Sequence, residues 1–247
     1  MSRVAVILLA AGSSSRFKGK EKKQFADLGG RAVWLRSLEL FSIRDDVAQI
    51  LIAVSDDDKE LFDRRYRANV AFLDTAKVVS GGNSRAESVQ NCLAQCKADI
   101  DLVCVHDSVR PCVTREQIDE VIQAAEEKGA AILAAPLSDT LKRAKDHQIE
   151  QTLPRDHLWL AQTPQVFRRE LLLHAYANAG SVDATATDCS SLVEALGETV
   201  TIVPSDGSNI KVTTSSDLRL ASAIIKSRPE RKAEGGFHPF GDEKMWG

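Results

Sequence analysis

Three short polar segments contain the residues best suited to chemistry, and each directly follows an apolar run. The first, Ala10–Arg16, reads AAGSSSR and offers an open glycine backbone, three hydroxyl groups and a guanidinium. Backbone N–H groups, hydroxyls and a guanidinium fork all bind phosphate oxygens. Basic side chains follow at Lys18, Lys20, Lys22 and Lys23. The segment predicts a polyphosphate cradle, although it matches neither GxGxxG nor GxxxxGK[ST]. The alternative is a serine and glycine turn followed by a solvated basic loop.

The second segment, Ser80–Ser88, reads SGGNSRAES. It predicts a glycine turn that enters an amphipathic helix, with Asn83 or Ser84 as the N-cap. The amides at the start of that helix, together with Arg85 and Ser88, suit a nucleobase or a phosphate. A Gly-Gly-Asn sequence before a helix is equally explained as a good turn without a ligand.

The third segment, His106–Pro111, places a carboxylate, Asp107, at the end of an apolar run. Mg²⁺ takes carboxylate oxygens and keeps several waters, so Asp107 is well placed to bind Mg²⁺ that bridges phosphates. His106 is better explained as a hydrogen-bonded histidine near the core than as a catalytic base. Arg110, just before the proline, has the alternative role of bracing Asp107.

The elements that position these segments follow from the apolar pattern. Runs rich in β-branched residues predict buried strands, at Val4–Ala10, Ile50–Val54, Val78–Val79, Leu102–Val105 and Ala131–Ala135. Apolar residues at three- and four-residue spacing predict helices between them, at Trp34–Phe41, Val89–Cys96 and Ile118–Ala125. Alternating strands and helices predict an α/β fold, with a mostly parallel, Rossmann-like sheet flanked by helices. Ligands of such sheets bind beyond the carboxyl ends of the strands, where the three polar segments would converge.

Two segments depart from this alternation. Residues 137–153 alternate, turn polar and alternate again, which predicts a protruding β-hairpin arm. A two-stranded arm is marginal by itself, so it is expected to pack on a partner subunit. Thr214 and Asp217 form a capping box that opens a last helix. Residues 227–247, rich in glycine, proline and charge, predict a poorly ordered tail. Without an internal repeat or a long linker, residues 1–226 are expected to form one domain that includes the arm.

Composition limits the partners and the compartment. The 247 residues include 32 Lys+Arg and 35 Asp+Glu, for a net charge of −3, which predicts neither nucleic acid nor an anionic membrane as a partner. The short apolar run near the start is a poor secretory signal. An odd number of cysteines, five, favours reduced thiols and a cytoplasmic protein. Cys92 and Cys96 have no second close pair, so core packing is favoured over zinc.

From about Val4 to Ile225 the sequence resembles the 2-C-methyl-D-erythritol 4-phosphate cytidylyltransferases of the non-mevalonate isoprenoid pathway, nucleotidyltransferases of mixed α/β fold. The resemblance rests on motifs in one order: LLAAGSSSRF with KKQF, SGGNSRAESV, HDSVRP, APLSDTLKR, TLPRDHLWLAQTPQVF, TATDCSSLVE and NIKVTTSSDL. It implies transfer of CMP from CTP to 2-C-methyl-D-erythritol 4-phosphate, with release of pyrophosphate and formation of 4-diphosphocytidyl-2-C-methyl-D-erythritol. It also implies a homodimer whose hairpin arms clasp.

The resemblance assigns roles to individual residues. The implied catalytic cations are Arg16, Lys23 and Lys211, and Asp107 is the implied ligand of Mg²⁺. The residues implied for the nucleotide are Ala10, Ala11, Gly12, Gly82, Asn83, Ser88 and Ser108. The residues implied for the acceptor are Asp107, Arg110, Thr140, Thr163, Thr187 and Lys211, with Arg155 from the neighbouring arm.

Some positions depart from the family pattern. Leu9 and Lys22 each replace a proline, Phe25 replaces a tyrosine, and Ser108-Val109 replaces a pair of alanines. The extra charge at Lys22 leaves two adjacent lysines as candidates, of which the one before Gln24 is favoured.

Three other functions are weighed. Ser108-Val109 is closer to the related ribitol-5-phosphate cytidylyltransferases, which gives the first alternative, whereas the segments 139–143 and 158–162 favour methylerythritol phosphate. A nucleotide-binding regulator without turnover is disfavoured, because the implied charged residues are all present. A nicotinamide-dependent dehydrogenase is disfavoured by the missing GxGxxG.

Overall fold

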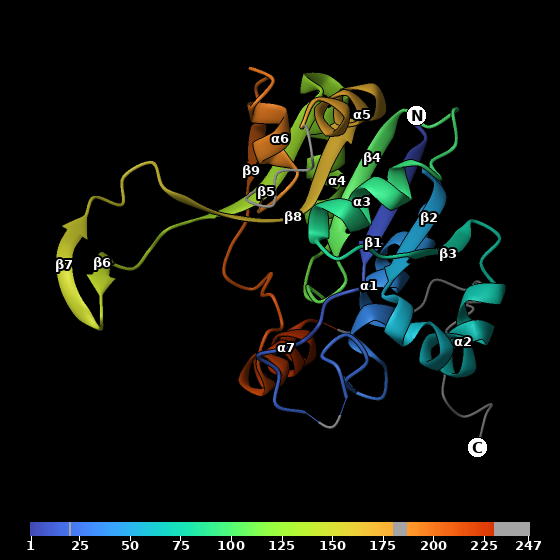
Figure 1. The fold of residues 1–247 in the computed structure, drawn as a ribbon, viewed down its shortest axis with the longest axis horizontal. Coiled ribbons are helices and arrows are strands. Elements are labelled where there is room, and N and C mark those ends of the chain that lie inside the picture. The colour runs from blue at the N-terminus through green and yellow to red at the C-terminus, as the bar shows by residue number, and fades with distance from the viewer. Residues whose placement is uncertain (20, 180–186, 230–247) are drawn as a thin grey trace.

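The computed structural model describes residues 1–19, 21–179 and 187–229. A seven-stranded sheet with the order β3-β2-β1-β4-β8-β5-β9 forms the centre of the molecule (Figure 1). Its strands are β1 Val4–Leu9, β2 Val47–Val54, β3 Ala76–Ser80, β4 Leu102–Asp107, β5 Ala130–Pro136, β8 Trp159–Arg168 and β9 Thr201–Pro204. In this sheet, strand β8 pairs antiparallel with both of its neighbours, β4 and β5. The predicted mostly parallel sheet is therefore confirmed, with one antiparallel strand that was not predicted.

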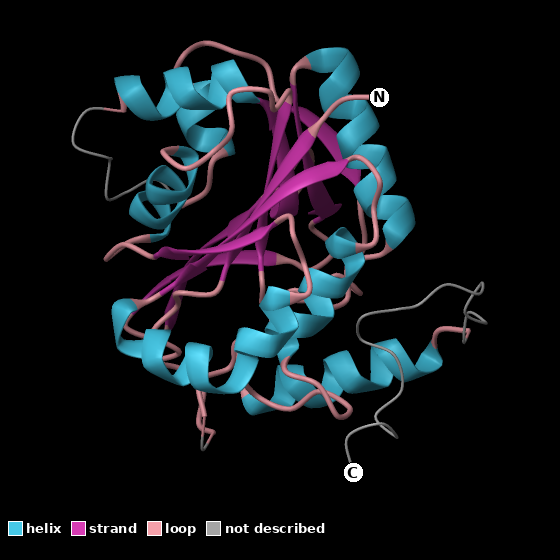
Figure 2. Ribbon diagram, turned by 90° about the vertical axis from the view of Figure 1, so that its right-hand side faces the viewer, coloured by secondary structure: helices cyan, strands magenta, loops and turns pink. Residues whose placement is uncertain are grey.

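Helices cover both faces of the sheet, as Figure 2 shows from the side. They are α1 Val33–Ser42, α2 Asp56–Ala71, α3 Arg85–Leu93, α4 Arg115–Lys128, α5 Arg169–Asn178, α6 Ser190–Glu194 and α7 Ser215–Ser227. Alternate residues of a strand point to opposite faces. Val6 and Leu8 of β1 accordingly pack with α1, α2 and α4, whereas Ala5 and Ile7 pack with α3, α5 and α6. Helix α7 belongs to a third, smaller apolar cluster that includes Leu28 and Val109.

Several predicted boundaries are close to the observed ones, whereas one helix is shifted and α2, α5, α6 and β9 were not predicted. The helix expected over Val89–Cys96 starts earlier, at Arg85, and ends at Leu93. Helix α2 was not predicted, because its sequence DDDKELFDRRYRANVA is largely polar and its buried aromatic residues are Phe62 and Tyr66 alone.

The predicted hairpin arm is confirmed. Strands β6 Leu141–Lys145 and β7 Gln148–Leu153 pair antiparallel and project away from the sheet (Figure 1). Asp146 and His147 join them with φ angles of 48° and 64°, as a two-residue turn of a right-twisted hairpin requires.

Within the described residues, no helix combines the length and the apolar character that crossing a bilayer requires. A single domain over residues 1–226 stays a prediction, and the predicted tail lies outside the described residues from position 230 onward. Lys20 and the first two residues of the motif TATDCSSLVE also lie outside the described residues.

Candidate active site

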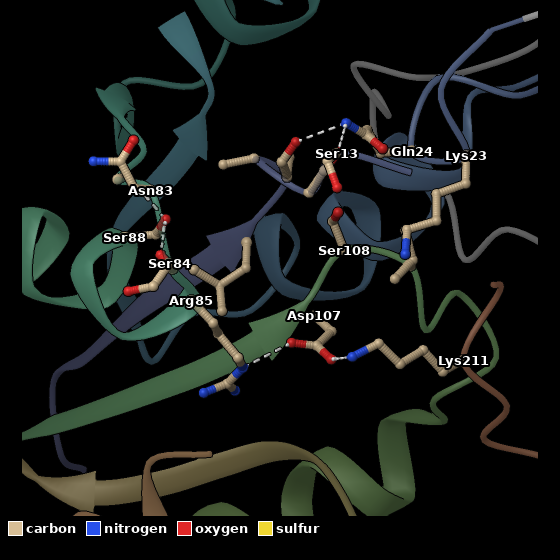
Figure 3. Close-up of a pocket in the computed structure, with 16 residues that line it drawn as sticks. Ser13, Lys23, Gln24, Asn83, Ser84, Arg85, Ser88, Asp107, Ser108 and Lys211 are labelled. Atoms are coloured by element: carbon tan, nitrogen blue, oxygen red, sulfur yellow. Dashed lines mark hydrogen bonds and ion pairs between the residues drawn. The ribbon is translucent and has the colours of Figure 1, made fainter. Parts of the chain in front are cut away.

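A pocket of about 330 Å³ lies beyond the carboxyl ends of β1, β3 and β4, where a sheet of this kind is expected to bind its ligand (Figure 3). All seven residues predicted for the nucleotide line it, which are Ala10, Ala11, Gly12, Gly82, Asn83, Ser88 and Ser108. The predicted charged residues Lys23, Asp107 and Lys211 line it as well. The three polar segments therefore converge as the sequence predicts.

The second polar segment is shaped by the start of α3. Ser84, rather than Asn83, is the N-cap, and its side chain accepts from the backbone N–H of Glu87. The Ser88 hydroxyl donates to the carbonyl oxygen of Ser84 at 2.8 Å and accepts from the N–H of Gly82 at 3.0 Å. Ser88 thereby folds the glycine turn against the helix start.

Close approach of two loops requires a glycine in this segment. The backbone N–H of Gly81 donates to the carbonyl oxygen of Val54 at 2.7 Å. A Cβ atom at Gly81 would lie 2.4 Å from the Cβ atom of Ala11, which no side chain tolerates. The first and second polar segments can therefore form two walls of one pocket.

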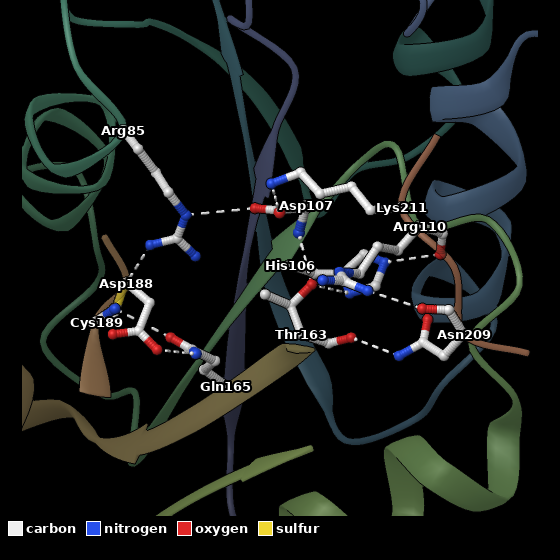
Figure 4. A network of polar contacts seen from close by, with 10 residues as sticks. All are labelled: Arg85, His106, Asp107, Arg110, Thr163, Gln165, Asp188, Cys189, Asn209 and Lys211. Atoms are coloured by element: carbon white, nitrogen blue, oxygen red, sulfur yellow. Dashed lines mark hydrogen bonds and ion pairs between the residues drawn. The ribbon is translucent and has the colours of Figure 1, made fainter. Parts of the chain in front are cut away.

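Asp107, the last residue of β4, lies between two cations (Figures 3 and 4). Its Oδ1 is 3.4 Å from Nε of Arg85, and its Oδ2 is 2.7 Å from Nζ of Lys211. Burial by itself raises the pKa of Asp107, but Arg85 and Lys211 outweigh burial and hold this pKa well below its usual range. The carboxylate is therefore ionised at neutral pH.

Lys23 approaches the same region from the first segment. Its side chain passes the glycine of that segment, since a Cβ atom at Gly12 would lie 3.9 Å from Cε of Lys23. Burial lowers the pKa of Lys23, and repulsion from Lys211 and from Arg16 lowers it further. Arg16 and Lys23 from near the start of the chain thus come close to Lys211 from near its end, and a bound polyanion would relieve their repulsion.

The donor set suits a metal ion that arrives with a substrate. Within the residues that the structure describes, no group of three or more His, Cys, Asp or Glu side chains could hold a metal. Mg²⁺ is commonly bound through one or two carboxylates together with substrate phosphates. A single ionised carboxylate, Asp107, at the wall of a cationic pocket fits this mode of binding.

Two residues predicted for the acceptor lie behind the pocket wall (Figure 4). Thr163 is 4% exposed, and its hydroxyl accepts from the backbone N–H of Asp107 at 3.0 Å, so it holds the backbone at the end of β4. Arg110 donates to the carbonyl oxygen of Asn209 at 2.7 Å, which turns its guanidinium toward the loop before α7. Neither residue is among those that line this pocket, and their predicted role toward the acceptor stays a prediction.

Four further predicted residues lie on exposed segments. Arg16 follows the cradle and is close enough to Lys23 to lower its pKa. Thr187 precedes α6. Thr140 and Arg155 flank the two strands of the arm, where the guanidinium of Arg155 donates to the carbonyl oxygen of Ser138. Neither Thr140 nor Arg155 lines the pocket of its own chain, and the strands β6 and β7 between them project away from the sheet (Figure 1).

His106 is a core residue, as the sequence favoured. Its ring is fully buried, with Nδ1 at 3.2 Å from the Thr163 hydroxyl and Nε2 at 3.3 Å from the carbonyl oxygen of Arg110. Burial lowers the pKa of His106 to about 3, so the imidazole is neutral in the physiological range. Cys92 is likewise buried in the core, and burial raises the pKa of its thiol to about 12.

Sequence reasoning missed two contributions to the site. The sequence predicts that Arg85 binds a nucleobase or a phosphate. In the structure its guanidinium contacts the carboxylate of Asp107 and, through Nη1 at 3.3 Å, the sulfur of Cys189. Gln24 was given no role of its own in the sequence motif KKQF, yet its buried side chain contacts the first polar segment. The partners of both lie far along the chain or on the backbone, where no residue spacing reveals them.

Comparison with known proteins agrees with this geometry. Residues 4–227 match the protein family described as 2-C-methyl-D-erythritol 4-phosphate cytidylyltransferase. The protein of that name from Pelotomaculum thermopropionicum is 38% identical over 237 residues, which cover 96% of this chain and 100% of that protein. The one from Bacillus pumilus is 39% identical over 221 residues, which cover 89% of this chain and 96% of that protein. The crystal structure of the enzyme from Thermus thermophilus aligns with a TM-score of 0.72 at 31% identity and covers 92% of this chain and 100% of that one. The chain thus belongs to the 2-C-methyl-D-erythritol 4-phosphate cytidylyltransferase family.

Proposed function

We propose that this protein transfers the cytidylyl group of CTP to 2-C-methyl-D-erythritol 4-phosphate and releases pyrophosphate. The observation that carries the proposal is the convergence of Lys23, Asp107 and Lys211 on a pocket that the predicted nucleotide residues line. Membership of the family gives the reaction and its place in non-mevalonate isoprenoid synthesis.

The reaction needs no covalent intermediate with the protein. An oxygen of the acceptor phosphate attacks the α-phosphorus of CTP, and a new phosphoanhydride bond forms as the α–β bond breaks. The electrons of the broken bond leave with pyrophosphate. Because the nucleophile is already an anion, the protein contributes alignment and neutralisation of charge.

In this proposal, different basic side chains bind the two reactants. Lys23 and Arg16 face the triphosphate and stabilise the charge that grows on the leaving pyrophosphate. Lys211, whose side chain is 40% exposed beside Asp107, meets the acceptor phosphate. Two polyanions repel each other, so cations on both sides are needed for them to react.

Asp107 is the residue that would hold Mg²⁺, and the ion would supply positive charge against the phosphates of CTP. In the structure, both carboxylate oxygens face cations, at Arg85 and Lys211. Arg85 contacts the carboxylate from the start of α3, whereas Lys211 approaches from the loop before α7.

We also propose a homodimer in which the arm of one subunit reaches the acceptor side of the other. The exposed positions of Arg155 and Thr140 beside the arm strands support this arrangement, since both residues are implied for the acceptor yet lie apart from their own pocket. A cytoplasmic location is proposed as well, and it is supported by five cysteines that are all free thiols.

The test is a pyrophosphate-release assay with Mg²⁺ and CTP and with each of two acceptors, methylerythritol 4-phosphate and ribitol 5-phosphate. The second acceptor is included because Ser108 and Val109 depart from the family toward the ribitol enzymes. We expect kcat/KM for methylerythritol phosphate to exceed that for ribitol phosphate by at least a hundredfold. Equal or reversed values would reject the proposed acceptor, and no release with either would reject the proposed activity.

A further inference from the structure

Gln24 is a buried polar residue that the proposed reaction does not use. Its side chain is 0% exposed, directly beside Lys23 in sequence. The backbone carbonyl oxygen of Gln24 accepts from the backbone N–H of Trp34 at 3.0 Å, which ties the residue to the start of α1. The next residue, Phe25, stacks on Tyr66 with ring centroids 5.8 Å apart. The backbone of Gln24 is therefore anchored in the core, and its amide is held under the first polar segment.

The amide group of Gln24 bonds to that segment with both of its ends, and Figure 3 shows the bonds that its nitrogen makes. Nε2 donates to the carbonyl oxygens of Ala10 and Gly12, each at 3.1 Å. Oε1 accepts from the hydroxyl of Ser14 at 3.0 Å. The same hydroxyl accepts from the backbone N–H of Lys23 at 3.2 Å. One side chain thus joins three residues of the cradle to the lysine that faces the triphosphate.

This contact determines which backbone groups remain for a ligand. The N–H groups of Ala11, Gly12 and Ser13 have no acceptor within the described part of the chain, whereas two carbonyl oxygens of the segment are bonded to Gln24. Ser14 has a φ of 59°, in the left-handed region that a serine enters only when its surroundings hold it there. A segment with its carbonyls tied back and its amides free is suited to an anion.

We propose that Gln24 is a positioning residue of the nucleotide site, which holds the Ala10–Ser14 cradle and, through Ser14, the backbone of Lys23 in the arrangement that receives the triphosphate. Gln24 is among the residues that line the pocket, but it is 0% exposed and its amide is bonded to the protein, so it acts on the reactants through the cradle. The inference rests on the proposed function for its kinetic test, but it also predicts behaviour of the ligand-free protein.

The central variant is Gln24→Met, which keeps the length of the side chain and removes its hydrogen bonds. Its matched control is Gln49→Met. Gln49 is also a buried glutamine, 5% exposed, and both ends of its amide are bonded, in this case to the backbone of Gln95 and of Lys97, but it lies outside the pocket. Both variants lose comparable hydrogen bonds, so a comparable loss of stability is expected from each.

The kinetic result expected for Gln24→Met is a fall in kcat/KM for CTP of roughly ten- to a hundredfold, the range for a buried polar contact that is left unmade. Gln49→Met should stay within threefold of the wild type. Ser14→Gly, which tolerates the left-handed backbone but removes the hydroxyl, should also lose activity. Because both act through one network, the double variant should lose little more than Gln24→Met alone.

A second readout needs no turnover. Amide hydrogen exchange of the peptide over residues 10–24, measured without ligand, should speed up at least tenfold in Gln24→Met and not in Gln49→Met. This result would support the inference even if the proposed acceptor were wrong. Unchanged exchange together with kcat/KM equal to that of Gln49→Met would overturn it.

Gln24→Glu separates positioning from bulk stability through pH. A carboxylate there would face two carbonyl oxygens in a buried site, so its pKa is expected to rise, and only its protonated form can donate. The activity of this variant relative to the wild type should therefore recover as the pH falls from 8 to 6, with no recovery in Gln24→Met. Identical pH profiles for the two variants would contradict a donor role of the Gln24 amide.

Discussion

Two adjacent lysines give the sharpest test of the site, because the structure sends them in different directions. Nζ of Lys22 pairs with Oδ2 of Asp58 at 2.8 Å, at the start of α2. Lys23 lines the pocket beside Lys211. The sequence left both as candidates for the triphosphate and favoured Lys23, and the geometry favours the same residue. The pair therefore supplies a matched set of variants, Lys23→Ala and Lys22→Ala.

The expected size of the effect follows from the charges that remain. A unit charge about 4 Å from a phosphate oxygen is worth roughly 4 kcal/mol at an effective dielectric constant near 20. Lys211 and Arg16 stay nearby in Lys23→Ala and offset part of that loss. We therefore expect the barrier to rise by about 3 kcal/mol, or about a hundredfold in kcat, with a smaller change in the KM for CTP.

Lys22→Ala should behave differently. Asp58 keeps its hydrogen bond from the Ser55 hydroxyl at 2.7 Å, and the lost ion pair is partly exposed, so the free energy of unfolding should fall by about 1 kcal/mol or less. The corresponding drop in Tm is roughly 2–4 °C, with kcat within twofold of the wild type. Initial rates of pyrophosphate release at saturating CTP, acceptor and Mg²⁺ measure both variants. If Lys23→Ala kept a third of the activity, or if Lys22→Ala lost as much, the assignment of Lys23 would be wrong.

Three more predictions concern the buried groups. Asp107→Asn should raise the Mg²⁺ concentration for half-maximal rate about tenfold, since an amide oxygen is a weaker ligand than a carboxylate, and an unchanged Mg²⁺ titration would exclude Asp107 as a ligand. Burial lowers the pKa of His106 from 6.5 to about 3. Between pH 6.5 and pH 3 the imidazole therefore binds a proton in the unfolded chain but not in the folded chain. The free energy of unfolding should fall by about 1.4 kcal/mol for each pH unit by which the pH drops in this range. Urea unfolding should therefore show the stability of the wild type relative to His106→Asn decreasing from pH 6.5 to pH 4; a constant difference would contradict the neutral core histidine. Burial raises the pKa of Cys92 to about 12 and that of Cys112 to about 11, so iodoacetamide at pH 8 should alkylate neither in the folded protein but both in guanidinium, as mass spectrometry would show. Labelling at equal rates in both states would mean that these thiols are not protected by the fold.

Much of the fold follows from local pattern. The apolar runs that end in the three polar segments predict β1, β3 and β4, because a buried parallel strand is apolar on both faces. Strand β8 was not predicted, since Gln162, Thr163 and Gln165 interrupt its apolar pattern. These polar residues are tolerated inside the sheet because each has partners far along the chain, including Asp206, Asp107 and Asp188.

The residues of the site likewise include some that the sequence could predict and others that it could not. Sequence motifs placed the nucleotide residues at the pocket because strand ends determine where loops emerge. They could not place Thr163 behind Asp107 or pair Arg85 with it, since these contacts depend on how β8 and α3 pack against β4. The role of Gln24 was equally hidden, because two of the oxygens that it binds belong to the backbone, and every residue type carries those.

Strand β8 connects the arm with the centre of the sheet. Residues 154–158 join the arm to β8, and β8 pairs with β4 in the middle of the sheet. Thr163, on this strand, bonds to the backbone of Asp107, and Gln165 bonds to the carboxylate of Asp188. The chain that leaves the hairpin therefore continues into the strand that holds both the backbone of Asp107 and the turn that starts α6.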